Sequence, residues 1–381
     1  MTILLVDDNQ VNLFVIEKIL KNAGYENCVS LSSAYELFDY LQLDAKNPAG
    51  SSVELILLDI MMPEVDGIEA CKRIKQNEKL KDIQIIFVTA LEDKTKLAEA
   101  LDIGGVDYIT KPINKTELLA RIRVALRLKA ELDWHTKQEA KIKYELDLAT
   151  HVQRSLLSAP LHEDNIQIEV SYLPSSNLAG DMYYWYKIND HRYAIILLDM
   201  MGHGISAALV CMFISSVLRE AVKQLVEPEL VIKELNRYMT LLQNAKEENI
   251  HYFTAIYIVI DTEQKMIEYV NAGHPSGYAL VDEKTLVPLN QGSCAVGFFE
   301  EIKVEKQFIQ YQKDVQIVLY TDGVLEAMGP CEIESEKHLQ TLTSSKWNYT
   351  QCLIDNLLPK EKQTNQPDDM CVLMIQAQAL N

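Results

Sequence analysis

The sequence of 381 residues lacks the excess of basic side chains that proteins which bind nucleic acid usually carry. Lys and Arg together number 36 against 55 Asp and Glu, and the formal net charge is −19 at pH 7. A chain this acidic is not expected to bind nucleic acid, and an anionic membrane surface would repel it.

Clustered cysteines and long apolar runs are absent as well. The seven cysteines are scattered, with no close pair and no His at metal-ligand spacing, which excludes a disulfide framework and a zinc site. The longest apolar run, "AALVCMFISSVL", is too short to cross a bilayer, and the first residues lack the basic start of a secretion signal. We therefore expect a cytoplasmic protein with reduced thiols and no membrane insertion.

An apolar fraction of 48% with 24% charged residues is typical of a folded protein, and the length indicates two domains. The first 125 residues alternate short apolar runs with amphipathic segments. Strands are expected at "ILLVDD", "ELILLDI", "IQIIFVTAL" and "DYITKPI", and helices at 9–23, 67–76, 95–103 and from 115. This alternation predicts an α/β domain with a parallel sheet.

Polar side chains stand where the four apolar runs end: Asp7, Asp8, Asp59, Thr89 and Lys111. Ligands of parallel sheets bind beyond the carboxyl ends of the strands, so these side chains mark a site. The segment resembles, from end to end, the receiver domain of two-component response regulators. The resemblance implies a flavodoxin-like fold with a parallel sheet of five strands.

The same resemblance assigns a role to each of these residues. Asp59 in "LLDIMMPEVDG" would accept a phosphoryl group from a cognate histidine kinase. Asp7, Asp8 and Asp59, with the backbone carbonyl of Met61, would bind Mg²⁺, which prefers carboxylate and phosphate oxygens. The phosphoryl group would be contacted or sensed by Thr89, Tyr108 and Lys111, and Pro112 would follow a cis bond. The alternative is a degenerate receiver that serves only as a docking module.

Residues 126–160 form a long helical stretch without an internal Gly or Pro before Ser158. A heptad seam can be drawn through Leu128, Leu132, His135, Glu139, Ile142, Leu146, Ala149, Gln153 and Leu156. This pattern favours a helical linker whose coiled coil would join two copies of the chain in a homodimer. An amphipathic helix packed on its own domain remains the alternative.

Residues 161–381 are rich in predicted strands, interrupted by helices near 206–225 and 228–244 and again between 333 and 358. Grouped strands and helices predict an α+β fold, here a β-sandwich flanked by helices. Aspartates recur near strand ends, often beside Gly: Asp181, Asp199, Asp322, Asp368 and Asp369. Carboxylates gathered without basic partners repel one another unless cations bind, so a metal site is predicted.

The motifs "AGD", "DMMGHGISAAL", "NAGHPSGY", "LYTDGVLEA" and "DDMCVLMI" resemble, in this order, a SpoIIE-type phosphatase domain of the metal-dependent type 2C class. The resemblance implies that two Mn²⁺ or Mg²⁺ ions are held by Asp181, Asp199, the backbone carbonyl of Met200, Asp322 and Asp368, with Asp369 as an additional candidate. Paired divalent ions activate water for phosphoryl transfer, and all-oxygen ligands suit Mn²⁺ or Mg²⁺ better than Zn²⁺.

Two functions follow from these resemblances. The first is a response regulator whose output is a metal-dependent phosphoserine and phosphothreonine phosphatase, controlled by phosphorylation of Asp59. Its implied substrate is a phosphorylated anti-sigma-factor antagonist with a STAS domain, in a partner-switching pathway. The second is an inactive phosphatase-like adaptor that binds a sigma factor or another partner under receiver control.

Overall fold

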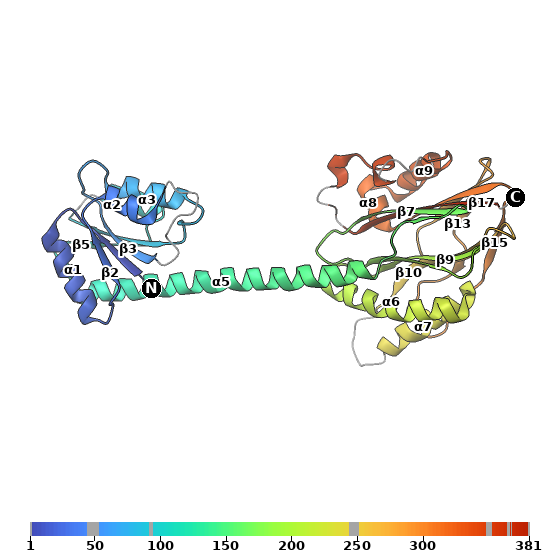
Figure 1. The fold of residues 1–381 in the computed structure, drawn as a ribbon, viewed down its shortest axis with the longest axis horizontal. Helices are drawn as coiled ribbons and strands as arrows, with labels where there is room; N and C mark the ends of the chain where they lie inside the picture. Colours follow the sequence, from blue (N-terminus) through green and yellow to red (C-terminus); the bar gives the residue numbers. More distant parts are fainter. Residues whose placement is uncertain are drawn as a thin grey trace. The chain divides into compact units, whose positions relative to one another are not determined.

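The computed structural model describes residues 2–43, 53–90, 94–243, 251–347, 353–363, 366 and 368–379. The chain divides into two compact units, Met1–Ile142 and Lys143–Asn381, which are described separately below (Figure 1).

The first unit is built on a parallel sheet of five strands, as the receiver resemblance implies, and their order is β2-β1-β3-β4-β5. Its strands are β1 (Thr2–Val6), β2 (Cys28–Leu31), β3 (Val53–Asp59), β4 (Gln84–Thr89) and β5 (Asp107–Thr110). The helices of this unit are α1 (Gln10–Asn22), α2 (Ala34–Leu41), α3 (Gly67–Gln76), α4 (Lys94–Asp102) and the start of α5 (Lys115–Ser155). The expected helices and strands form at their predicted places, and β2 and α2 are additional elements.

Two apolar cores cover the two faces of this sheet. Side chains of α2, α3 and α4 pack on one face, and those of α1 and the start of α5 pack on the other. Polar residues set the first turn of three helices: the side chains of Asn9, Ser33 and Asp66 each accept a hydrogen bond from a backbone N–H of the helix that follows. These caps fix the residue at which each of the three helices begins.

Helix α5 is 41 residues long and runs without interruption through the predicted linker. Leu128, Leu132 and Ile142 of the predicted seam are exposed. Gln153 of the same seam is instead buried within the second unit. At this end, therefore, the helix packs on its own domain, which is the alternative interpretation of the pattern.

The second unit contains two sheets of six strands. One has the order β14-β11-β10-β9-β8, with β15 paired to β11, and the other has the order β13-β12-β16-β17-β7-β6. The strands are β6 (Leu161–His162), β7 (Ile166–Leu173), β8 (Asp181–Lys187), β9 (Arg192–Met200), β10 (Phe253–Asp261), β11 (Met266–Ala272), β12 (Gly277–Val281), β13 (Thr285–Leu289), β14 (Gly292–Ser293), β15 (Gln307–Gln310), β16 (Asp314–Tyr320) and β17 (Met370–Gln378). Neighbouring strands are antiparallel except for the short pairing of β11 with β14.

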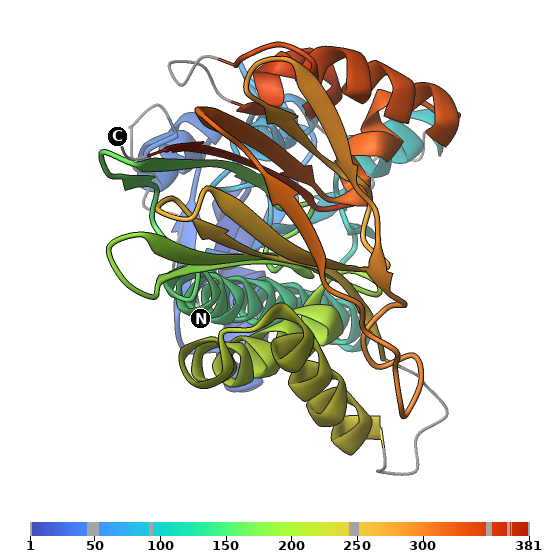
Figure 2. The ribbon, with the colours of Figure 1, turned by 90° about the vertical axis from the view of Figure 1, so that its right-hand side faces the viewer.

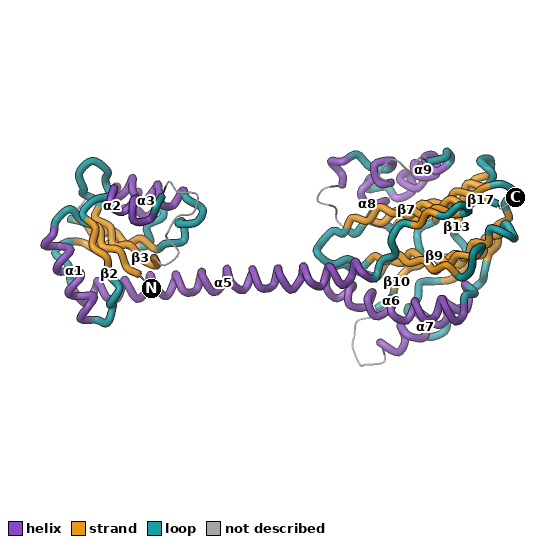
Figure 3. The backbone as a smooth tube through the Cα atoms, in the orientation of Figure 1, coloured by secondary structure: helices purple, strands orange, loops and turns teal. Residues whose placement is uncertain are grey.

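The two sheets pack face to face and helices cover their outer faces, as Figures 2 and 3 show. The central core consists of apolar side chains from both sheets. Helices α6 (Ile205–Leu225) and α7 (Pro228–Gln243) cover the sheet that contains β9 and β10. Helices α8 (Asp322–Met328) and α9 (Glu332–Thr343) and the short turns η2 (Leu353–Asn356) and η3 (Lys360–Gln363) belong to the other side. This is the predicted α+β sandwich, with α8 as an unexpected helix; residue 244, the predicted end of α7, lies outside the described residues.

Among the described residues, one helix, α6, is long and apolar enough to cross a membrane by length and composition alone. Its buried residues, which include Cys211, Ile214 and Leu218, pack into the core against the sheet. The helix of 21 residues extends beyond the run "AALVCMFISSVL", which alone is too short for a membrane span, and 44% of its most apolar window is buried.

Candidate functional sites

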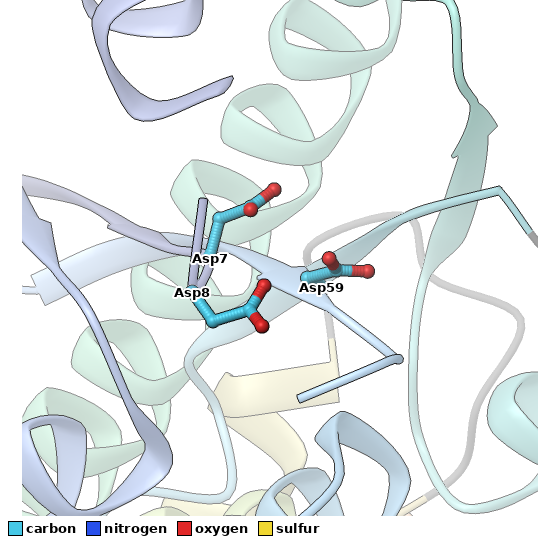
Figure 4. A group of neighbouring side chains, drawn as sticks. All are labelled: Asp7, Asp8 and Asp59. Atoms are coloured by element: carbon cyan, nitrogen blue, oxygen red, sulfur yellow. The ribbon is translucent and has the colours of Figure 1, made fainter. Parts of the chain in front are cut away.

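The carboxyl ends of β1 and β3 bring three aspartates together in the first unit. Asp7 and Asp8 follow β1, and Asp59 is the last residue of β3 (Figure 4). One ligand oxygen from each of the three lies within 4.8 Å of the others. Asp7 and Asp59 are buried and Asp8 is exposed, so the cluster has one side open to solvent. A divalent cation could be held here by carboxylates from two strands.

Lys111 supplies the positive charge next to this cluster. Its Nζ donates to Asp7 Oδ2 at 2.8 Å and to Asp59 Oδ2 at 2.7 Å. Burial raises the pKa of Asp59 although Lys111 opposes the shift. Burial also lowers the pKa of Lys111, but its two carboxylate partners outweigh this effect and leave the pKa raised. The ammonium group is therefore in position to neutralise negative charge that arrives at Asp59.

Two backbone features fix Asp59. The backbone N–H of Met61 donates to Asp59 Oδ1 at 3.2 Å, and the side chain of Met61 is exposed. A Cβ atom on Gly67 would lie 2.1 Å from the carbonyl oxygen of Asp59, so the start of α3 can approach only because residue 67 is glycine. Sequence reasoning did not identify Gly67, although it follows the aspartate within the quoted motif.

The other predicted receiver residues line the same end of the sheet. Thr89 ends β4, is fully buried, and accepts a hydrogen bond from the backbone N–H of Lys111 through its carbonyl. Tyr108 lies in β5 with its ring 6.0 Å from the guanidinium carbon of Arg121. The peptide bond between Lys111 and Pro112 is cis, as expected.

The aspartates of the second unit come from both sheets. Asp181 opens β8 and is paired in register with Asp199 near the end of β9. Asp322 begins α8 directly after β16, and Asp368 precedes β17 in the other sheet. Met200, whose carbonyl was predicted as a ligand, ends β9 and has a buried side chain. The sandwich thus brings together residues that are up to 187 positions apart in the sequence (181 to 368).

These carboxyl groups are close enough for their charges to affect one another. Asp199 is repelled by the charges of Asp322 and Asp368, and Asp181 is repelled by the charge of Asp199. Burial and the charge of Asp199 raise the pKa of Asp181 well above its usual range. Burial and the charge of Asp322 raise the pKa of Asp199 to about 8. Burial likewise raises the pKa of Asp368, although the backbone N–H of Asp369 opposes the shift.

Such a group is chemically suited to cations. Carboxyls that share protons in the absence of positive partners can exchange those protons for divalent ions, which prefer oxygen ligands. The acidic groups here are spread more widely than the triad of the first unit, the one group of described residues with three ligand atoms within 4.8 Å. No three of these carboxylates, all of them among the described residues, offer ligand atoms that lie within 4.8 Å of one another.

Asp181 and its neighbours are held by residues that sequence reasoning did not single out. Thr321 Oγ1 donates to Asp181 Oδ2 at 2.7 Å and accepts from the backbone N–H of Cys371 at 2.9 Å. Thr321 lies inside the quoted "LYTDG" motif, directly before Asp322, so its position in the motif was the available signal. Fully buried, it links β8 to the adjacent strand ends of the other sheet.

Asp369, the additional metal candidate, has both carboxylate oxygens engaged. Oδ1 accepts from the backbone N–H and the hydroxyl of Ser175, and Oδ2 accepts from the backbone N–H of Gly180 at 2.7 Å. A Cβ on Gly323 would lie 2.1 Å from the carbonyl oxygen of Asp369, so α8 starts in tight contact with this residue. These contacts give Asp369 a role in fixing the loop before β8.

The two histidines of the motifs differ in environment. His203 is exposed and lies close enough to Asp368 to lower the pKa of that carboxyl. His274 is buried, and burial lowers its pKa to about 3, so the ring is neutral. His274 Nδ1 lies 2.8 Å from Thr254 Oγ1, and Thr254 is the register partner of Asp199 on β10.

Comparison with known families agrees with this division of the chain. Residues 3–123 match the family described as "Response regulator receiver domain", and residues 189–378 match "Stage II sporulation protein E (SpoIIE)". "Phosphoserine phosphatase RsbP" of Bacillus subtilis (strain 168) is 41% identical over 189 residues, which are 50% of this chain and 47% of that protein. "Transcriptional regulatory protein YvrH" of the same organism is 36% identical over 126 residues, or 33% of this chain and 49% of that protein. The chain therefore spans about half the length of these curated relatives.

Among solved structures, the "SiaA-PP2C domain of Pseudomonas aeruginosa" is similar with a TM-score of 0.52 and 21% identity, over 62% of this chain and 97% of that domain. This likeness shows the PP2C fold of the second unit. The chain belongs to the response regulators in which an N-terminal receiver domain is joined to a SpoIIE-type domain of the PP2C fold.

Proposed function

We propose that the SpoIIE-type domain hydrolyses phosphoserine or phosphothreonine in a protein substrate, with Asp181, Asp199, Asp322 and Asp368 holding two Mn²⁺ or Mg²⁺ ions. One observation carries the proposal. Asp199 is the register partner of Asp181 on the adjacent strand, and the charges of Asp322 and Asp368, which lie next to strands of the other sheet, act on it. The 41% identity to a phosphoserine phosphatase supports the same reaction class.

The residues of this chain would act by fixing charge and position. Asp199, the register partner of Asp181, would contribute a second carboxylate to the metal site, and the hydrogen bond from Thr321 would hold Asp181 in a single orientation. The ions would supply an activated water and would neutralise the phosphoryl oxygens. The exposed His203 is close enough to affect Asp368, which makes it a candidate for proton transfer to the leaving oxygen.

Control by the receiver is the second part of the proposal. A cognate histidine kinase would phosphorylate Asp59, with Mg²⁺ held by Asp7, Asp8, Asp59 and the carbonyl of Met61. Lys111, which already contacts Asp59, would pair with the new phosphoryl group, and Thr89 and Tyr108 would change position in response. The signal would reach the phosphatase domain through α5.

The proposed partners follow from the same resemblance. The substrate would be a phosphorylated anti-sigma-factor antagonist with a STAS domain, in a partner-switching pathway in the cytoplasm. Two copies of the chain would associate through the exposed part of the α5 seam, where Leu128, Leu132 and Ile142 are open to solvent.

Phosphate release from a phosphoserine protein tests the proposed reaction. The full chain with Mn²⁺ should release phosphate, and Asp199→Ala should reduce the rate by roughly 1,000-fold, since it removes a ligand shared by both ions. Asp190→Ala is the matched control, because that aspartate is exposed in a turn of the same domain and should leave the rate unchanged. Equal rates in the parent and Asp199→Ala would contradict the site; absence of both activity and Mn²⁺ binding in the parent would favour the adaptor function.

A further inference from the structure

The loop of residues 174–180, between β7 and β8, leads directly into Asp181. It is held from two sides. Asp369 accepts hydrogen bonds from Ser175 and Gly180, and the last turns of α5 hold the loop through Thr150 and Gln153. The position of this loop sets the position of the first carboxylate of the site.

Gln153 makes the closest of these contacts. Its side-chain Nε2 donates to the carbonyl of Ala179 at 2.6 Å, and the backbone N–H of Ala179 donates to its Oε1 at 3.1 Å. Gln153 is 5% exposed and Ala179 is fully buried. The side-chain amide thus replaces the neighbouring strand that would otherwise satisfy both backbone groups of Ala179.

Little freedom remains between Ala179 and Asp181. The intervening Gly180 donates to Asp369 Oδ2, and a Cβ at this position would lie 3.0 Å from the carbonyl oxygen of Gly202 and 3.2 Å from that of Met200. A displacement of Ala179 would therefore move Asp181, or would break the hydrogen bond to Asp369. The geometry connects a side chain of α5 to a proposed metal ligand through two peptide units.

The helix that carries Gln153 begins at Lys115, after the last strand of the receiver, and continues unbroken to Ser155. We propose that Gln153 is a positioning residue that transmits the state of α5 to Asp181, so that a shift of the helix changes the affinity of the phosphatase site for its metal ions. This inference rests on the proposed function. It assigns a specific contact to the coupling between the two domains.

The test compares Gln153→Met with the parent in the full chain. Met fills a similar volume and lacks both hydrogen-bonding groups, so packing is largely kept while the contact to Ala179 is lost. Gln138→Met is the matched control, since it changes the same residue type in the linker part of the same helix, outside the seam. Gln153→Glu keeps the acceptor for the Ala179 N–H but loses the donor to the Ala179 carbonyl. This second variant provides the test if Gln153→Met does not fold.

Three measurements separate positioning from general stability. Calorimetry with Mn²⁺ should give an affinity lower by roughly 10-fold or more in Gln153→Met, the usual effect of removing a residue that orients a ligand, and an intermediate loss in Gln153→Glu. At saturating Mn²⁺, KM for the phosphoprotein should change little. The ratio of phosphatase rates with and without beryllium fluoride bound at Asp59 should fall toward one in Gln153→Met and stay at the parent value in Gln138→Met.

Hydrogen exchange at the Ala179 amide provides a readout that does not depend on catalysis. In the parent, the amide should be protected from exchange, and this protection should change when beryllium fluoride binds the receiver. In Gln153→Met, the amide should exchange freely, and beryllium fluoride should no longer alter its exchange rate. A Gln153→Met protein with parental Mn²⁺ affinity, parental response to beryllium fluoride and unchanged exchange at Ala179 would overturn the inference. If the parent itself binds no Mn²⁺ and releases no phosphate, the proposed function fails, and the exchange experiment still decides whether Gln153 couples α5 to the loop.

Discussion

Asp181 and Asp199 lie directly opposite each other on the antiparallel strands β8 and β9, and the charge of Asp199 raises the pKa of Asp181. Neighbouring carboxyls in a largely buried place repel each other when both are ionised, unless a cation binds between them. We therefore expect the stability of the domain to depend on pH and on divalent metal.

Without metal, the second domain should become less stable as the pH rises. Burial and Asp322 raise the pKa of Asp199 to about 8 from an ordinary value of 3.8, so its contribution is fully present below pH 3.8 and is lost as the pH rises through 8. On the proposed function, Mn²⁺ would replace the protons that the raised pKa values keep on these carboxyls, and it should therefore increase the melting temperature more at pH 8 than at pH 5. Calorimetric melts with Mn²⁺ or with chelator at both pH values check this.

Asp199→Asn is the control for that experiment. It removes one of the repelling charges, and it should raise the melting temperature of the metal-free chain at pH 8 while abolishing the increase with Mn²⁺. An unchanged response to Mn²⁺ in this variant would exclude Asp199 as a ligand.

His274 should make the domain sensitive to acid. Its folded pKa of about 3 is below the ordinary 6.5, so its contribution to stability is present above pH 6.5 and is lost as the pH falls toward 3. Between pH 7 and pH 5 this group alone should cost about 2 kcal/mol of unfolding free energy. Urea unfolding of the parent and of His274→Asn, in which an amide can replace Nδ1 next to Thr254, should show a weaker pH dependence in the variant; the exposed His135→Asn should behave like the parent.

Lys111→Met should destabilise the metal-free receiver by about 3 kcal/mol, because it leaves Asp7 and Asp59 buried without their cation. Mg²⁺ should then bind more tightly, since it no longer competes with the ammonium group for the same oxygens. Urea unfolding and magnesium titration of the parent and the variant measure both effects. Weaker Mg²⁺ binding in Lys111→Met would contradict competition at the triad.

Gly323→Ala should lower stability by about 3 kcal/mol and reduce Mn²⁺ affinity, because its Cβ would lie 2.1 Å from the carbonyl oxygen of Asp369 and would displace the start of α8 that carries Asp322. The comparison is Gly329→Ala, where the new Cβ meets no atom within 4 Å. Equal melting temperatures for the two variants would show that the close approach is not required.

The two domains could be predicted from the sequence, and the aspartates near strand ends could be identified as candidate site residues, because both features have local signatures. Alternating apolar runs predict the parallel sheet, and strand ends place Asp59, Thr89 and Lys111 at one edge. In contrast, β2 has no fully buried residue, and α8 is a helix of seven residues that contains a glycine, so neither has a strong periodic signal.

The supporting contacts of the site could not be predicted, because they join distant residues through backbone groups. Gln153 fits a heptad seam by spacing, yet its amide binds the backbone of Ala179, 26 residues further along the chain. The carboxylate of Asp369 likewise accepts hydrogen bonds from the backbone of Ser175 and of Gly180, which lie 194 and 189 residues away in the sequence. Such contacts depend on how the two sheets pack together, which no local pattern encodes.

The location of Mn²⁺ in crystals of the full chain tests the central claim most directly. Anomalous scattering should show two ions roughly 3.5 to 4 Å apart, with Asp199 between them and with Asp181, Asp322 and Asp368 as the surrounding ligands. Finding no manganese among these four carboxylates, under conditions in which the protein releases phosphate, would contradict the account.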